Sequence, residues 1–244
     1  FLKKEKILTN HIKINSKKSI GLYLIENNKK GEREFFYWRS NSAAKTFFEN
    51  IKINKYFNLL KKYDAIYFSG ITLSIYDYKS LNIFYKLIKR LKKNNIKIFF
   101  DLNIRLKNWK STSIAKKNIK KFCSISDIIF ISKEDLNELD FFDIESFVFK
   151  YSKSSYVLFR EGSGNILTYE NGKFFSKYKF KLLKNVKDTT GCGDAFNASF
   201  IYNYFKKNNI KNSVLLSHKL AKKVAFNKGA LIPKKLFKKK DFEK

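Results

Sequence analysis

Short apolar segments alternate with amphipathic segments through the middle of the chain. Four segments are apolar on both faces, which predicts buried strands: 64–70, 97–103, 127–132 and 156–161. Residues 80–95 place apolar side chains at helical spacing, and a lysine-rich helix is expected near 112–122. Buried strands that alternate with amphipathic helices predict an α/β fold, a three-layer αβα sandwich around a mostly parallel sheet.

The rest of the pattern predicts two hairpins and more helices. Two short strands about a turn are expected at 20–26 and 33–39, outside the strand–helix alternation. Together they predict a small β-hairpin lid at about 19–40. Residues 164–180 predict a second hairpin that turns at Asn171 and Gly172. Helices are expected at these places: 41–51, 133–139 (one turn), 193–206 and 212–226.

The composition suits one globular domain with a core of its own. The chain has 244 residues, of which 44% are hydrophobic. It contains no apolar run long enough for a transmembrane helix and no secretory signal at its start, so no membrane partner is expected. Cys123 and Cys192 are too few for a disulfide framework, which indicates a cytoplasmic setting. Cys123 is expected to be a buried small hydrophobe.

The net charge of +31 raises the hypothesis of a nucleic-acid partner. The lysines are spread along the chain instead of forming one stripe, and only five residues are arginine. Lysine, asparagine, isoleucine, phenylalanine and tyrosine are also the residues of A/T-rich codons. We therefore expect solvated lysine faces rather than a nucleic-acid footprint. The chain starts at Phe1 and lacks methionine, so we expect a fragment of a longer protein.

The stretch DTTGCGDAF, residues 188–196, is the strongest chemical signal. Gly191 and Gly193 permit backbone angles that expose consecutive amides, and a helix start behind them favours an anion. Asp194 is an acid in the same turn, which suits proton removal from a hydroxyl during phosphoryl transfer. Spacing alone leaves a second interpretation open, a helix start with a glycine turn and no chemistry.

This stretch resembles the DTxGAGD signature of the ribokinase-like (PfkB) sugar kinases. The resemblance implies that Asp194 is the catalytic base and that the amides of Gly191, Cys192 and Gly193 form an anion hole. It also implies ATP as phosphoryl donor, with Mg²⁺. Cys192 stands where the family commonly has alanine.

Further segments resemble, in the same order, the 2-keto-3-deoxygluconate (2-dehydro-3-deoxygluconate) kinases of that family: GLYLIE, GEREFFYWRSNSAA, YFSGITLS, FDLNIRLKNW and NKGALIP. The resemblance implies that Tyr23, Tyr37 and Arg39 bind the substrate, and that Asp194 contacts the hydroxyl that is phosphorylated. It places Asn103 and Arg105 near both substrate and ATP. An acidic sugar suits an arginine fork, although hairpin packing alone would also explain the tyrosines.

The ATP-binding positions depart from the family pattern. In the family's NxxE element Ser132 replaces asparagine and Asp135 replaces glutamate, so Asp135 is a weak candidate for the metal. In the KxGxxG turn Arg160 replaces lysine, and Gly162 and Gly164 lie closer together than usual. The resemblance still implies that Ser132, Arg160, both glycines and the 191–193 turn bind ATP.

The leading hypothesis is a ribokinase-like kinase domain over 1–244 that uses ATP to phosphorylate the terminal hydroxyl of 2-keto-3-deoxygluconate. One alternative is a fructokinase-type or ribokinase-type enzyme. Two others are a degenerate kinase scaffold that binds nucleic acid and an inactive copy that serves as a partner subunit. An apolar face on the lid hairpin would favour a homo-oligomer. His11 and His218 have no partners for a triad or a metal and are expected to be structural.

Overall fold

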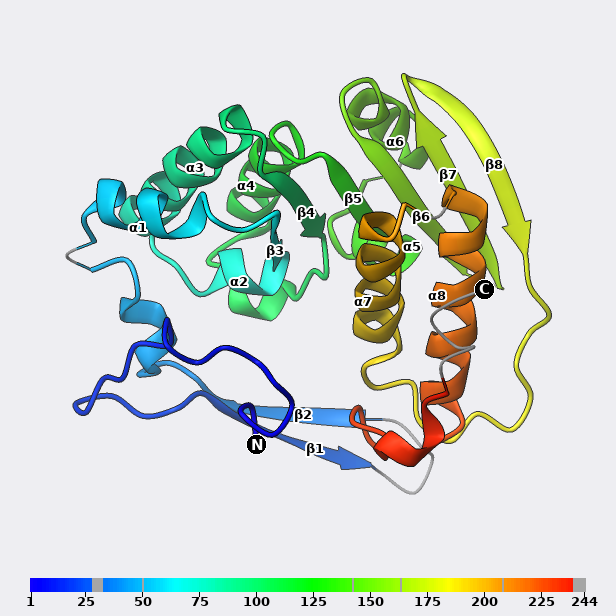
Figure 1. Ribbon diagram of the computed structural model, residues 1–244, viewed down its shortest axis with the longest axis horizontal. Helices are drawn as coiled ribbons and strands as arrows, with labels where there is room; N and C mark the ends of the chain where they lie inside the picture. Colours follow the sequence, from blue (N-terminus) through cyan, green and yellow to red (C-terminus); the bar gives the residue numbers. More distant parts are fainter. Residues whose placement is uncertain (28–32, 50, 142, 163, 208, 239–244) are drawn as a thin grey trace. The chain divides into compact units, whose positions relative to one another are not determined.

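The computed structural model describes residues 1–27, 33–49, 51–141, 143–162, 164–207 and 209–238 (Figure 1). The chain divides into two compact units, Phe1–Tyr178 and Lys179–Lys244. The first unit contains most of the sheet and its helices, and the second contains a pair of long helices.

A six-stranded sheet forms the framework of the first unit, with its strands in sequence order. The strands are β3 (Ala65–Ser69), β4 (Lys97–Asp101), β5 (Ile128–Ser132), β6 (Tyr156–Gly162), β7 (Asn165–Glu170) and β8 (Lys173–Lys179). β3 to β6 pair in parallel, whereas β7 runs antiparallel to β6. The four predicted apolar strands are therefore confirmed. The hairpin turn at Asn171 and Gly172 is confirmed too, with φ of 54° and 67°, as a two-residue turn of this type requires.

Six helices accompany this sheet in the described part of the first unit: α1 (Ile53–Leu60), α2 (Gly70–Ser74), α3 (Tyr78–Lys93), α4 (Thr112–Cys123), α5 (Lys133–Glu138) and α6 (Ile144–Ser152). Asp77 caps α3 by accepting from the amide of Ser80, and Ser111 caps α4 in the same way. The helices predicted at 80–95 and 112–122 are confirmed. The prediction for 133–139 is also confirmed, as the short helix α5.

The helix predicted at 41–51 is wrong in type. Residues Ala43–Thr46 form a short 3₁₀ helix (η1) instead. Ser42 makes no capping hydrogen bond, and the Thr46 hydroxyl donates to the carbonyl of Ala43 at 2.9 Å. A side chain that bonds to the local backbone competes with a regular helix.

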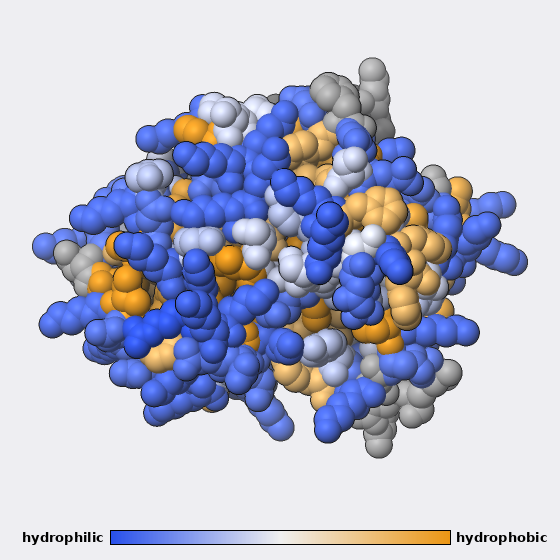
Figure 2. Space-filling model, turned by 90° about the horizontal axis from the view of Figure 1, so that it is seen from above, coloured by the Kyte–Doolittle hydropathy of each residue, from blue (hydrophilic) through white to orange (hydrophobic). Residues whose placement is uncertain are grey.

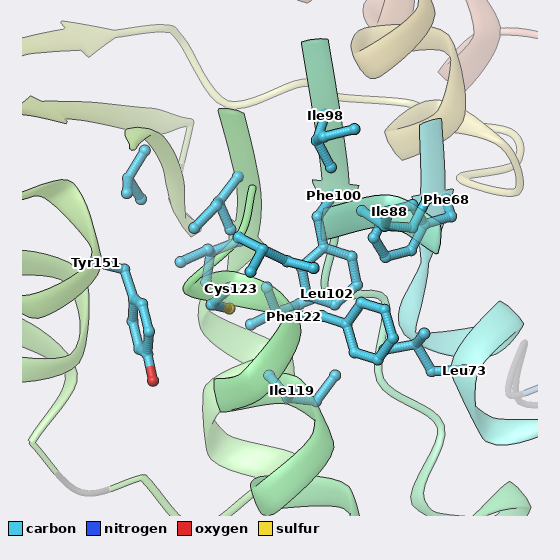
Figure 3. Packing of buried hydrophobic residues seen from close by; sticks show 14 of the residues in the cluster. Phe68, Leu73, Ile88, Ile98, Phe100, Leu102, Ile119, Phe122, Cys123 and Tyr151 are labelled. Carbon is cyan, nitrogen blue, oxygen red and sulfur yellow. The ribbon is translucent and has the colours of Figure 1, made fainter. Parts of the chain in front are cut away.

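Aromatic rings and aliphatic side chains from the sheet and its helices form one core (Figure 3). Phe68 of β3 packs on Phe100 of β4 and on Phe122 of α4, with ring centroids 5.0 Å and 5.5 Å apart. Cys123 is fully buried, as expected, and burial raises the pKa of its thiol. This packing fixes the strands beneath the loops that follow their carboxyl ends.

The predicted N-terminal hairpin is a separate two-stranded sheet of β1 (Leu22–Asn27) and β2 (Arg33–Trp38). Its connector, 28–32, lies outside the described residues. One face exposes paired apolar side chains, Leu22 opposite Trp38 and Leu24 opposite Phe36. The lid role of this hairpin and the homo-oligomer stay predictions.

The second unit is built on α7 (Cys192–Phe205) and α8 (Ile210–Ala225), which pack together and are followed by the 3₁₀ turn η3 (Lys234–Leu236). Both predicted helices are confirmed. Asn209 caps α8 by accepting from the amide of Asn212. His218 stacks on Phe180 with ring centroids 3.6 Å apart, and burial lowers its pKa, which fits the expected structural role.

The surface is strongly hydrophilic. Figure 2 shows hydrophilic side chains spread over the viewed face, with smaller apolar areas between them. On α3 the lysines at 79, 86, 89 and 93 are exposed, as expected for solvated faces. Among the residues that the structure describes, no helix has the length and apolar character needed to cross a membrane.

Candidate functional site

The glycine turn ahead of α7 has the geometry that its sequence predicts. Gly191 is the N-cap of α7 and has a left-handed backbone, with φ of 78°. A Cβ at this position would lie 2.8 Å from the Cβ of Ala230, so the turn requires glycine for two independent reasons. The amide of Cys192 donates to the carbonyl of Thr189 at 3.2 Å. First-turn amides have no partner inside a helix, and the predicted role of the Gly193 amide in binding an anion stays a prediction.

Asp194 lies in the first turn of α7 and is exposed. Its carboxylate is thus accessible to a substrate, at the helix end where the dipole favours a negative charge. Amide donors and a carboxylate within four consecutive residues are the groups that phosphoryl transfer to a hydroxyl requires.

Asp188, which the sequence analysis did not single out, holds this turn in place. Its Oδ1 accepts from the amide of Thr190 at 2.8 Å, an Asx-turn, and its Oδ2 accepts from the amide of Gly229 at 2.9 Å. One carboxylate therefore ties the 188–191 turn to the 227–233 segment (NKGALIP). The contact with Thr190 had a signal in the sequence, because an aspartate often accepts a hydrogen bond from the backbone amide two residues later.

We predict that Asp188→Ala lowers the free energy of unfolding by about 2 kcal/mol, because two turn amides lose a charged acceptor. Asp188→Asn keeps one acceptor oxygen and should lose less. Urea unfolding of both variants measures the difference. An Ala variant with the wild-type midpoint would show that these hydrogen bonds contribute nothing to stability.

In the first unit, charged side chains meet at the carboxyl ends of the parallel strands. Asp101 at the end of β4 is buried, and its Oδ1 lies 3.5 Å from Nη2 of Arg160 on β6. The hydroxyl of Tyr67, on β3, donates to the other oxygen of Asp101 at 3.4 Å. Arg160 is thus held at the edge of the sheet where open α/β folds bind ligands. Arg160 was predicted from the sequence as a site residue, whereas Asp101 was not.

The loop after β4 carries Asn103 and Arg105 on an irregular backbone. Asn103 has a positive φ of 33°. The loop lies directly against Gly70, whose amide donates to the carbonyl of Leu102 at 3.1 Å. Arg105 is exposed, and its guanidinium donates to the carbonyl of Ile104.

Ser132 and Asp135 form a capping box at the start of α5, so both belong to one hydrogen-bonded unit. Asp135 is buried, and its Oδ2 accepts from the amide and the hydroxyl of Ser132 at 3.0 Å and 2.7 Å. Its Oδ1 accepts from the amide of Ile104 at 2.7 Å. These three donors occupy most of the roughly four lone-pair positions of the carboxylate and leave room for a metal ion on Oδ1 alone.

No group of three or more His, Cys, Asp or Glu is placed to hold a metal ion within the part of the chain that the structure describes. Mg²⁺ commonly binds through one or two carboxylates together with substrate phosphates, which does not require such a group. The metal role of Asp135 stays a prediction.

Gly162 and Gly164 both have left-handed backbones, with φ of 87° and 78°. They flank residue 163, which lies outside the described residues, at the irregular junction between β6 and β7. The positive φ explains why glycine occupies both positions. Their predicted contact with ATP stays a prediction.

The hairpin brings together the three residues predicted to bind the substrate. Tyr23 pairs with Tyr37 across the strands, with ring centroids 6.4 Å apart. The Cζ of Arg39 lies 4.4 Å from the Tyr37 ring centroid and 5.3 Å from that of Tyr23. One hairpin thus presents a guanidinium beside two phenols.

The chain is similar to carbohydrate kinases. Residues 1–235 match the pfkB family of carbohydrate kinases. A 2-dehydro-3-deoxygluconokinase of Dickeya dadantii is 27% identical over 235 residues, which covers 94% of this chain and 76% of the relative. A probable chloroplastic fructokinase-6 of Arabidopsis thaliana is 33% identical over 177 residues, which covers 70% and 44%.

Solved structures confirm the predicted ribokinase-like α/β fold. A fructokinase of Xylella fastidiosa with bound ATP superposes with a TM-score of 0.79 at 17% identity, over 94% of this chain and 74% of that one. The mostly parallel sheet and the small separate hairpin agree with this fold.

Proposed function

Because the chain belongs to the pfkB family of carbohydrate kinases, we propose that it phosphorylates the terminal hydroxyl of 2-keto-3-deoxygluconate with ATP. The products are the 6-phosphate of the sugar acid and ADP. The similarity to a named 2-dehydro-3-deoxygluconokinase over 94% of the chain supports this substrate. Because two cysteines are too few for a disulfide framework, we place the protein in the cytoplasm.

The hairpin cluster is the observation that carries the choice of substrate. A carboxylate distinguishes this sugar acid from fructose and ribose, and a guanidinium binds a carboxylate through two parallel hydrogen bonds. Cation–π contacts with Tyr37 and Tyr23 restrict the side chain of Arg39, so it loses less conformational entropy when it binds a carboxylate. The two phenol groups supply hydrogen bonds for sugar hydroxyls.

In the proposed reaction Asp194 takes the proton of the terminal hydroxyl. The sugar oxygen then forms a bond to the γ-phosphorus, the bond from phosphorus to the β–γ bridging oxygen breaks, and ADP leaves with that electron pair. The amides of Gly191, Cys192 and Gly193 are assigned to the negative charge on the transferred group, for which the Cys192 amide must leave the carbonyl of Thr189.

We assign the binding of the nucleotide to Arg160, Gly162 and Gly164. Contacts with the phosphates of the nucleotide are assigned to Asn103, Arg105 and Ser132. ATP supplies the phosphoryl group, and Mg²⁺ neutralises charge on its phosphates. ATP bound to the Xylella fastidiosa fructokinase of the same fold supports ATP as the nucleotide.

We predict that Arg39→Ala raises the KM for the sugar acid about tenfold to a hundredfold and leaves turnover of neutral sugars unchanged, because only the acid loses a charged partner. A coupled ADP-release assay measures both. Arg39→Lys keeps the charge but lacks the fork, so we expect an intermediate KM. Lys89→Ala removes an exposed charge of α3 and serves as the control.

The second candidate is a fructokinase. The probable fructokinase-6 of Arabidopsis thaliana has the higher identity, 33% over 177 residues, which favours it. This candidate predicts that fructose is turned over faster than the sugar acid. It also predicts that the Arg39→Ala variant keeps the wild-type KM for fructose.

A further inference from the structure

Two carboxylates of α5 bind the backbone of the loop that carries Asn103 and Arg105. Oδ1 of Asp135 accepts from the amide of Ile104 at 2.7 Å, and Oε1 of Glu138 accepts from the amide of Leu106 at 2.9 Å. We call Asp135 and Glu138 the α5 clamp. The amides that it binds belong to the residues on either side of Arg105.

The spacing of the clamp matches the geometry of both elements. Asp135 and Glu138 are three residues apart on a helix and therefore lie on the same side of it. The amide of Leu106 opens the 3₁₀ turn η2 (Leu106–Asn108) and has no partner inside that turn, so an acceptor from another element can bind it. The loop follows β4 and α5 follows β5, and these two strands are parallel neighbours. The clamp thus joins the carboxyl ends of adjacent strands.

The clamp is rigid because its first member is fixed in turn. Asp135 is 4% exposed, and Ser132 binds its second oxygen through both amide and hydroxyl. Leu102 and Ile104 are fully buried on the loop side. Asn103 lies between these two anchors in a positive-φ conformation, which a free loop would rarely adopt.

The carboxylates bind amides here and are not paired with the nearby guanidinium by any contact that the structure gives. The Arg105 guanidinium donates instead to the carbonyl of Ile104. The negative charges of the clamp therefore stabilise the backbone, and Arg105 remains exposed. An exposed arginine on a fixed backbone is pre-organised to bind an anion.

On the basis of the function proposed above, we propose that Asp135 and Glu138 are positioning residues that hold Asn103 and Arg105 for the sugar and the phosphates. Asp135 then acts through the loop backbone. Glu138 has the more specific role, since Asp135 also caps α5 whereas Glu138 binds the loop at the other end of that helix.

Three variants of the full chain test this proposal. Glu138→Ala removes the acceptor, Glu138→Gln keeps an oxygen in the place of Oε1, and Glu145→Ala removes an exposed carboxylate on α6 as the control. Kinetics use the carbohydrate that the wild-type enzyme turns over fastest. Hydrogen–deuterium exchange of the peptide that contains residues 103–107 reports on the loop without any substrate.

We expect Glu138→Ala to raise the KM for the carbohydrate about tenfold and to have a smaller effect on kcat. A tenfold change corresponds to the loss of one hydrogen bond to a charged acceptor. Exchange in the 103–107 peptide should accelerate while other peptides keep their rates. Glu138→Gln should restore both values close to wild type, and Glu145→Ala should change neither.

Two results would overturn the proposal. In the first, Glu138→Ala behaves like Glu145→Ala in both KM and exchange, so the clamp does not hold the loop. In the second, exchange accelerates but KM and kcat stay at wild-type values, so the held loop has no positioning role. A wild-type enzyme that turns over only neutral sugars contradicts the proposed substrate instead, and the clamp is then tested with those sugars.

Discussion

Replacement of Asp194 by asparagine is expected to lower kcat about a thousandfold, because the sugar hydroxyl then loses its general base. The asparagine side chain keeps the size of the original and its place in the first turn of α7, so the KM for ATP should change little. The loss of a carboxylate at the helix N-terminus should cost only about 0.5 kcal/mol of stability. The coupled ADP-release assay, run beside thermal unfolding, separates the two effects.

Asp140→Asn is a matched control for this variant. Asp140 is exposed and has a positive φ of 50°, a conformation that asparagine tolerates. It should keep wild-type turnover. If Asp194→Asn turned over sugar as fast as Asp140→Asn, Asp194 would not be the base, and the second interpretation of the turn, a helix start without chemistry, would gain support.

Gly70→Ala is expected to cause the largest loss of stability, more than about 3 kcal/mol. Gly70 opens α2 directly after β3, and a Cβ there would lie 2.0 Å from the carbonyl oxygen of Leu102. That oxygen belongs to the backbone, so no side chain can move aside to make room. The loop that carries Asn103 and Arg105 would have to shift, and activity should fall with stability.

Gly21→Ala is the control for this effect. A Cβ at Gly21 would meet side chains of Arg39 and Ser42 at ordinary contact distances of 3.5 Å. We expect its free energy of unfolding, measured with urea, to stay within about 0.5 kcal/mol of the wild-type value. A Gly70→Ala protein with the same midpoint as Gly21→Ala would contradict the close approach of α2 to the loop.

The parts of the fold that could be predicted are those with a strong local pattern. The buried strands and the helices α3, α4 and α8 follow from apolar spacing, whereas α7 has no clear apolar face and follows from the glycine turn that precedes it. α2 could not be predicted in this way, because the sequence pattern places Gly70 at the end of a strand and the helix has only five residues. η1 differs from the predicted helix because Thr46 bonds to its own local backbone.

The candidate site was predictable where a motif occupies consecutive residues, and less so where the contacts are distant in sequence. The turn at Gly191 and the hairpin pair Tyr23 and Tyr37 have local signals. Asp101 on β4 meets Arg160 on β6 across the intervening strand β5, and Glu138 meets an amide 32 residues away. Such contacts depend on the tertiary arrangement of the strand ends, which a single sequence does not display.

The most direct test of the account is the carbohydrate specificity of the enzyme. We would measure ADP release with ATP, Mg²⁺ and 2-keto-3-deoxygluconate, beside fructose and ribose at the same concentrations. The account predicts the highest kcat/KM for the sugar acid. Turnover of fructose or ribose alone would keep the kinase but contradict the assignment of Arg39, and no turnover by a folded protein would contradict the proposed reaction.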